Sequence, residues 1–173
     1  MHTFSVSELH APLLITSLPH IGPQRFLQVL AYFGTAINAC RAPAQDWRCL
    51  NLPAAAIDAR QNRQLHEAAD AAVRWQEQSG CQILLHDAAG YPSLLLETAG
   101  APPVLFVQGD PLLLQQPQLA VIGSRYCSPG GEQLAFDFAK TLAASGCCIS
   151  SGLALGIDSA AHQGALAAQG PTL

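Results

Sequence analysis

The spacing of apolar residues divides the chain into three regions, and the first, residues 1–79, is predicted to be helical. The apolar positions that recur at helical spacing are Leu9, Leu13, Leu14, Phe26, Leu27, Leu30 and Phe33. Pro23 suits a first helical turn because it has no N–H to leave unpaired, and Gly34 suits a helix end. A further amphipathic helix is predicted over residues 62–78.

The second region, residues 80–118, is predicted to connect the other two and to contain two short strands. Residues 83–86 and 104–107 are apolar runs bounded by turn residues, as strands often are. Tyr91-Pro92 and the prolines at 102 and 103 favour extended backbone between these runs.

The third region, residues 119–173, alternates strand and helix patterns. Residues 119–122 form a near-continuous apolar run, which is typical of a parallel strand covered on both faces. A second strand is predicted at residues 147–150, and residues 172–173 resemble the opening of a third. We therefore predict an α/β fold: a helical N-terminal domain followed by a Rossmann-like parallel sheet that is incomplete where the sequence stops.

Two helices are predicted between these strands. The first covers residues 131–144, and it is expected to present Leu134, Ala135, Phe138 and Leu142 to the sheet. The second runs to Gln169, with Asp158 as its N-cap.

Composition narrows the class of protein. Half of the 173 residues are hydrophobic and 12% are charged, which disfavours disorder. The apolar stretches are broken well short of the about 20 residues that a membrane span needs. The first eight residues lack the pattern of a secretion signal, so a cytoplasmic location is predicted. The net charge of −4 provides no overall basic field, so any nucleic-acid binding must come from a local site.

The six cysteines raise the question of a metal site or disulfides. They are Cys40, Cys49, Cys81, Cys127, Cys147 and Cys148. None forms a C-x-x-C pair, the spacing in which thiolate ligands commonly occur. Free, buried cysteines acting as small apolar residues are favoured, and no metal is predicted.

Two glycine-containing loops are the most informative segments. Residues 123–131 follow the first strand of the third region, and residues 151–158 follow the second. In a parallel sheet both loops lie on one edge, and each leads into a helix N-terminus with unpaired amides. Arg125 adds a forked cation suited to phosphate. A phosphate-binding edge is favoured over the alternative, in which the glycines only permit tight turns.

Neither loop matches a common nucleotide motif. G-x-G-x-x-G and the G-K-[ST] of a P-loop are both missing, which disfavours NAD and ATP, so no cofactor is predicted. No catalytic set is visible either. His162 follows Asp158 by four residues, and a helix-packed histidine is favoured over a general base. We therefore expect a binding protein, not an enzyme.

Both loops closely resemble the DNA-processing protein A family, also called DprA or Smf. The matching segments are residues 120–125 (AVIGSR), 151–162 (SGLALGIDSAAH) and 164–166 (GAL), with weaker matches at residues 18–34, 91–95 and 102–109. The resemblance implies a bacterial protein that binds and protects incoming single-stranded DNA during natural transformation and helps to load the recombinase RecA.

The resemblance also implies the residues of the DNA site. Arg125 is expected to be central to a pocket for the DNA backbone. The expected backbone or hydroxyl donors are Gly123, Ser124, Ser151, Gly152 and Gly156. Tyr126 is the nearby candidate for stacking on a base, and it is equally suited to packing.

The helical N-terminal domain is similar to SAM or helix-hairpin-helix domains. Residues 18–33 resemble a helix-hairpin-helix, with His20 where glycine is usual. A structural role for this domain is favoured over a second DNA site.

The chain departs from the family in its length. Residues 119–173 contain Arg125 and Lys140 as cations against three carboxylates, so we expect weak DNA binding by this fragment and tighter binding by a full-length protein. An unpaired strand edge is expected to favour self-association. Two alternatives remain: a small-nucleotide enzyme or sensor of the related phosphoribohydrolase-like group, and a structural product that binds nothing.

Overall fold

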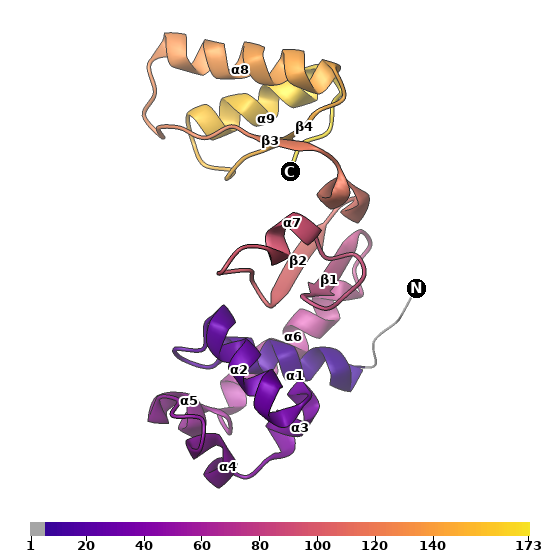
Figure 1. The fold of residues 1–173 in the computed structure, drawn as a ribbon. Helices are drawn as coiled ribbons and strands as arrows, with labels where there is room; N and C mark the ends of the chain where they lie inside the picture. The colour runs from indigo at the N-terminus through magenta and orange to yellow at the C-terminus, as the bar shows by residue number, and fades with distance from the viewer. Residues whose placement is uncertain (1–5) are drawn as a thin grey trace. The chain divides into compact units, whose positions relative to one another are not determined.

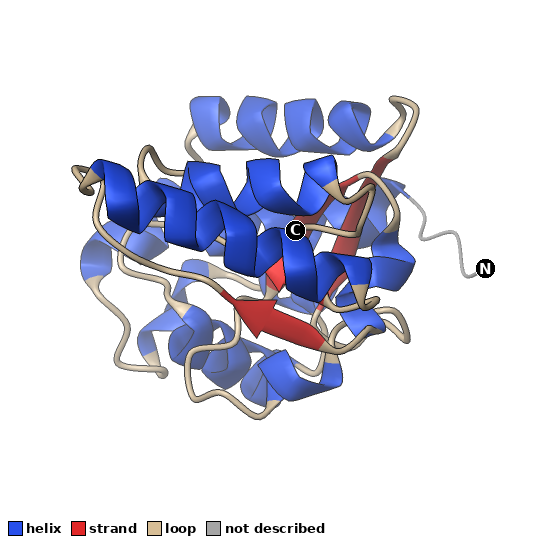
Figure 2. Ribbon diagram, turned by 90° about the horizontal axis from the view of Figure 1, so that it is seen from above, coloured by secondary structure: helices blue, strands red, loops and turns tan. Residues whose placement is uncertain are grey.

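The computed structural model describes residues 6–173. Its contacts divide the chain into two compact units, the first ending at Asp110 and the second running from Pro111 to Leu173 (Figure 1). Helices account for most of the regular structure, and the strands are few and short (Figure 2). No helix in the described part of the chain is long and apolar enough to cross a membrane.

The first unit begins with helices, as predicted. They are α1 (Val6–Ser17), α2 (Pro23–Phe33), α3 (Ala36–Arg41), α4 (Ala44–Arg48), α5 (Ala54–Ala59) and α6 (Arg63–Gln76). Polar caps define two of their starts: the Thr35 side chain accepts from the amide of Asn38, and the Asn62 side chain accepts from that of Gln64. The helix predicted over residues 62–78 is confirmed as α6.

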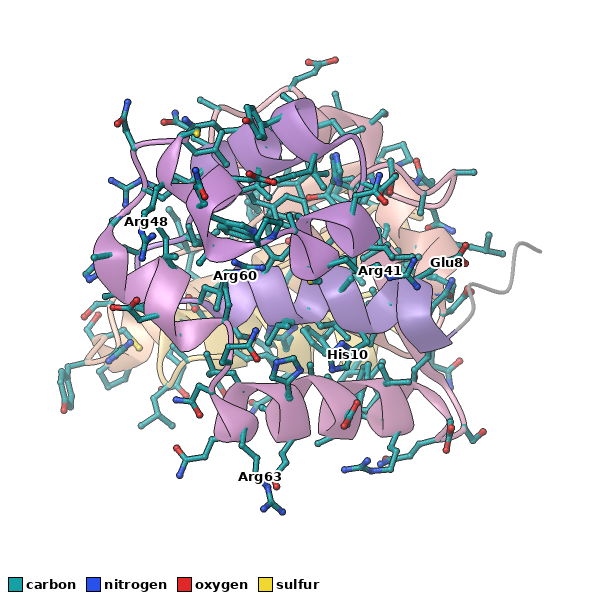
Figure 3. The ribbon with its side chains drawn as sticks, turned by 90° about the horizontal axis from the view of Figure 1, so that it is seen from below. Glu8, His10, Arg41, Arg48, Arg60 and Arg63 are labelled. Carbon is teal, nitrogen blue, oxygen red and sulfur yellow. The ribbon has the colours of Figure 1, made fainter. Side chains whose placement is uncertain are left out.

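Arg60 and Trp47 organise the interior of these helices. The Arg60 guanidinium donates to the carbonyl oxygens of Ala39, Cys40 and Ala42, at 3.3, 3.3 and 2.5 Å, and so closes the C-terminal end of α3. It also lies 4.5 Å from the ring centroid of Trp47. Trp47 in turn donates from Nε1 to the carbonyl of Ala39 at 2.8 Å. Figure 3 shows Arg60 among the helices, whereas Arg63 points outward.

The two strands predicted in residues 80–118 belong to the first unit. They are β1 (Cys81–Leu85) and β2 (Val104–Gln108), joined by a segment that contains α7 (Ser93–Leu96), and they pair antiparallel with Ile83 opposite Phe106. Ile83 and Leu85 pack on apolar residues of α1 and α6. The segment that we expected to be a connection therefore forms part of the first unit's core up to its boundary at Asp110.

The second unit has the strand–helix alternation predicted for residues 119–173. After a short 3-10 helix (Pro111–Gln115) come β3 (Gln118–Ala120), α8 (Pro129–Ala144), β4 (Cys148–Ser150) and α9 (Ile157–Ala167). The strands β3 and β4 are parallel, with Leu119 opposite Ile149. Thr172 forms a parallel bridge with Ile149, which confirms that a third strand begins there. The α/β fold class is confirmed.

The predicted apolar face of α8 is confirmed for Ala135 and Leu142, which packs partly buried against the core, and is wrong for Leu134 and Phe138. The buried row consists of Ala135, Ala139 and Ala143, whereas Leu134 and Phe138 are 67% and 58% exposed. The physical reason is the close approach of α9: a Cβ placed on Gly164 would lie 3.0 Å from the carbonyl carbon of Phe136 and 3.1 Å from the amide nitrogen of Lys140. Only small side chains fit between helices this close (α8 and α9 in Figure 1).

Two further expectations are corrected. All three residues of β3 are exposed, so this strand is not covered on both faces as its apolar run predicted. The helices α8 and α9 pack on each other and on β4, where Ile149 is fully buried. All six cysteines are free thiols in the structure, and the expectation that they are buried holds for Cys148 alone.

Candidate phosphate-binding site

Both glycine loops lie where parallel strands end and helices begin. Residues 121–128 connect β3 to α8, and residues 151–156 connect β4 to α9. Ser128 caps α8 by accepting from the amide of Gly131 at 3.2 Å, and Pro129 occupies the first turn. The N-cap of α9 is Gly156, with φ 79° and ψ −127°. Asp158 was predicted as this cap and instead lies inside the first turn.

The two loops touch each other through their backbones. The amide of Ile157 donates to the carbonyl of Ser124 at 3.2 Å. Gly156 packs against the same carbonyl, and a Cβ at this position would also lie 2.7 Å from the carbonyl oxygen of Arg125. A Cβ on Gly123 would lie 2.6 Å from Cγ1 of Ile157. The Arg125 backbone is therefore adjacent to Gly156, the arrangement that a joint anion site requires.

Most amides of the two loops have no acceptor. Within residues 6–173, the N–H groups of Gly123, Ser124 and Arg125 donate to no backbone or side-chain oxygen, and neither do those of residues 152–156. Gly123, Ser124, Arg125 and Gly152 are exposed. Amides left without partners in a fixed loop bind an acceptor supplied by water or a ligand. Both loops therefore present unpaired donors to the surroundings.

The two serines assigned to the site differ in the hydrogen-bond donors that they leave free for a ligand. Ser124 accepts through Oγ from the amide of Tyr126 at 3.1 Å, so its hydroxyl proton remains available for donation. Ser151 donates its hydroxyl proton to the carbonyl of Val121 at 2.7 Å, and its amide donates to the carbonyl of Leu173 at 3.0 Å. Both donors of Ser151 are engaged, so this serine holds the second loop against the end of β3.

Arg125 and Tyr126 extend into solvent beside these amides. Both side chains are exposed, Tyr126 to 94%. Within the described part of the chain, the Arg125 guanidinium makes no ion pair or hydrogen bond. It is thus available to an external anion, and the Tyr126 ring is available for stacking.

Asp158 and His162 lie one turn apart on α9 and are both 8% exposed. His162 packs as predicted, with Nδ1 2.7 Å from Oγ1 of Thr172. The Thr172 hydroxyl donates its proton to the carbonyl of Ile149 at 2.8 Å. The His162 ring is therefore the donor to Thr172, through Nδ1. The buried Nε2 then has no partner among the described atoms. No group of three His, Cys, Asp or Glu side chains in residues 6–173 is arranged to hold a metal ion.

The turn between α1 and α2 contains His20, the residue that stands where a helix-hairpin-helix motif usually has glycine. His20, between α1 and α2, has φ 62°, the left-handed conformation for which glycine is usual. Arg25 donates to the carbonyl of His20 at 2.7 Å and stabilises this turn. Sequence reasoning identified the position but not that histidine would adopt the glycine-like conformation.

The parallel strands, their crossover helices and the adjoining glycine loops define a Rossmann-like α/β protein with unpaired amides along one edge of its sheet. The chain belongs to the family described as DNA recombination-mediator protein A, whose sequence model matches residues 55–173. It is 41% identical over 104 residues to Protein Smf of Escherichia coli (strain K12), a match that covers 60% of this chain and 28% of the relative.

A protein sequence and a solved structure from Streptococcus pneumoniae agree with this assignment. The chain is 43% identical over 83 residues to its DNA processing protein DprA (strain ATCC BAA-255 / R6), a match covering 48% of this chain and 29% of that protein. The X-ray structure of DNA processing protein A (DprA) from the same species superposes with a TM-score of 0.65 at 27% identity. That superposition covers 99% of this chain and 57% of the other, so this chain spans only part of its relatives.

Proposed function

We propose that this chain is part of a single-stranded-DNA-binding protein, whose second unit holds the sugar–phosphate backbone of the strand. The observation that carries the proposal is the set of unpaired amides on two touching loops beside the exposed guanidinium of Arg125. Phosphate oxygens are acceptors and carry negative charge, so they match both kinds of group. Membership of a family described as a DNA recombination mediator supports DNA as the source of the phosphate.

Each residue has a distinct part in the proposed site. Arg125 supplies the forked cation, Ser124 supplies a hydroxyl proton, and Gly123, Gly152 and Gly156 supply amides. Ser151 keeps the second loop in place and contacts the strand only indirectly. Tyr126 stacks on a base next to the bound phosphate, a contact that tolerates any sequence because every base has a flat face.

The role of the whole protein follows from its relatives. We extend the proposal to protection of an incoming strand in natural transformation and to loading of the recombinase RecA, in the cytoplasm and with no catalytic step. The likeness to proteins named DprA and Smf supports this role. The exposed residues of β3 support the accompanying expectation that copies self-associate.

The proposed affinity of this chain is low. Residues 111–173 contain two cations, Arg125 and Lys140, against three carboxylates. Affinity for a nucleic-acid backbone grows with the number of phosphates neutralised, and the salt dependence for single strands has a slope of about −0.7 per phosphate. One or two neutralised phosphates thus predict weak binding with a shallow salt slope.

The test is fluorescence anisotropy of a labelled single-stranded oligonucleotide with the 173-residue chain over a salt series. Arg125→Ala is expected to lower the affinity about tenfold or more, because a charge-assisted contact is worth about 1.5–3 kcal/mol. Lys140→Ala is the matched control: it removes the same charge from α8, roughly 16 Å along the helix from the loop. An unchanged affinity in Arg125→Ala, or an equal loss in both variants, would remove Arg125 from the site.

The same assay separates the proposal from its rivals. Duplex DNA and free nucleotides are expected to bind more weakly than single strands at equal salt. Preferential binding or turnover of a free nucleotide would favour a nucleotide enzyme or sensor. Failure to bind any of the three would favour a structural role for this segment.

A further inference from the structure

The carboxylate of Asp158 lies directly beside the second glycine loop. It is 8% exposed, and Oδ2 lies 2.8 Å from the position that a Cβ on Gly152 would occupy. Among residues 6–173, no hydrogen bond or ion pair involves this carboxylate. His162, one turn further along α9, directs Nδ1 to Thr172 and does not pair with it.

Asp158 makes the α9 end of the proposed site less favourable for an anion than the Arg125 end. The partial positive charge at the N-terminus of α9 faces the protein's own carboxylate in the first turn, and that carboxylate neutralises it. At the first loop, the exposed Arg125 guanidinium has no such neighbour. The two loops both offer amides, but the second loop is therefore less positive than the first.

A phosphate bound at Gly152 would lie close to this negative charge. A phosphate oxygen accepting from the Gly152 amide is at most about 8 Å from Oδ2, from standard bond lengths and a hydrogen-bond distance of about 2.9 Å. Charges at this separation repel appreciably at a partly buried site. The repulsion scales with the ligand's charge, so a phosphomonoester, which is nearly a dianion at neutral pH, is disfavoured more than a phosphodiester, which is a monoanion.

We infer that Asp158 is a specificity determinant that makes the site select the phosphodiester of a nucleic-acid strand against the phosphomonoester of a free nucleotide or a strand end. The inference rests on the proposed phosphate site. Amide-rich loops at helix N-termini commonly bind nucleotides. The inference explains how such loops can prefer the backbone of a nucleic-acid strand. The diester lies along the first loop and Arg125, and the amides near Asp158 take its remaining oxygen or a bridging water.

The experiment compares thymidine 5′-monophosphate with the diester TpT, which share a base and a sugar and differ in charge. The ligands are titrated into the ¹⁵N-labelled chain, and the glycine amides of both loops are followed by NMR. For the unaltered protein we expect TpT to bind at least as tightly as the monophosphate. Asp158→Asn is expected to improve binding of the monophosphate about fivefold more than binding of TpT.

Two controls separate selectivity from a structural effect. Glu132→Gln removes a carboxylate from the first turn of α8, where the side chain is exposed, and should change the ratio of the two affinities less than twofold. Asp158→Glu retains the charge and should keep the preference of the unaltered protein. If Asp158→Asn does not fold, the unaltered protein alone decides: tighter binding of the monophosphate than of TpT would overturn the inference.

The outcomes also distinguish this inference from the proposed function. An unchanged ratio in a folded Asp158→Asn protein that still binds single strands through Arg125 would refute the inference and leave the function intact. A selective gain for the monophosphate in Asp158→Asn, with no binding of single strands by either protein, would refute the function and leave only the discrimination by phosphate charge supported.

Discussion

Gly156 packs against the carbonyl oxygen of Ser124, and this contact joins the two loops of the proposed site. The glycine has φ 79° and ψ −127°, which disfavours any residue with a Cβ, and the space beside it is filled by the Ser124 and Arg125 carbonyls. The amide of the next residue, Ile157, donates to the same Ser124 oxygen. Close approach and conformation therefore both require glycine at this position.

Gly156→Ala is expected to lower the free energy of unfolding of the second unit by more than about 2 kcal/mol, because the strain of a positive φ adds to the collision with two carbonyls. Thermal unfolding followed by circular dichroism measures the loss. Gly130→Ala is the control, since nothing lies within 4 Å of its Cβ position and it belongs to the first turn of α8. That change should be neutral or stabilising by up to about 1 kcal/mol. Equal effects of the two substitutions would disprove the close contact.

The corrected face of α8 predicts opposite outcomes for neighbouring residues. Ala139 is fully buried between the helices, so Ala139→Leu should cost about 1–3 kcal/mol or more by overpacking. Phe138 is mostly exposed, so Phe138→Gln should change the stability by less than about 1 kcal/mol. Urea unfolding of both variants tests the register of this helix. A larger loss of stability from Phe138→Gln than from Ala139→Leu would support the face predicted from the sequence, on which Phe138 packs against the sheet.

Arg60 is predicted to be essential to the first unit. Arg60→Met removes donors from three carbonyls and the stacking on Trp47, and should cost about 2–4 kcal/mol. Arg63→Ala is the matched control: its side chain is exposed and pairs with Glu67 at 2.7 Å. The loss of such a surface pair should cost less than about 1 kcal/mol. Chemical unfolding measures both, and comparable losses would show that the carbonyl contacts of Arg60 contribute little.

The cysteines are expected to react with thiol reagents in a defined order. Burial raises the pKa of the Cys40 thiol, an effect that Arg60 partly opposes. Burial, together with Cys147, also raises the pKa of Cys148. A raised pKa leaves less thiolate at a given pH, so both should react at least about tenfold more slowly than the exposed Cys49 near pH 8.

Iodoacetamide labelling followed by peptide mass spectrometry gives the order site by site. Raising the pH should narrow the difference as more of the two hindered thiols ionise, and full unfolding should abolish it. Rapid labelling of Cys148 in the folded protein would contradict its burial at the centre of the second unit.

The sequence by itself determined the type and order of the elements and the location of the candidate site. The repeat of a helix or strand appears directly in the spacing of its apolar residues, so it can be read from a short stretch of sequence. Such local patterns include the helical spacing in residues 62–78, the apolar runs of β1 and β2, and the loops 123–131 and 151–158. The loops were also placed correctly on one edge, since the carboxyl ends of parallel strands meet there.

Tertiary structure decided what depends on the approach of distant segments. Gly164 lets α9 come close to α8, and this selects an alanine row in place of Leu134 and Phe138 as the buried face. The hydroxyl of Ser151 turns to Val121, thirty residues away along the chain, and is lost as a ligand donor. Asp158 lies in the first turn of α9 with its carboxylate against Gly152, and it is not the helix cap. Such outcomes follow from steric fit and hydrogen-bond competition between segments, which local periodicity does not encode.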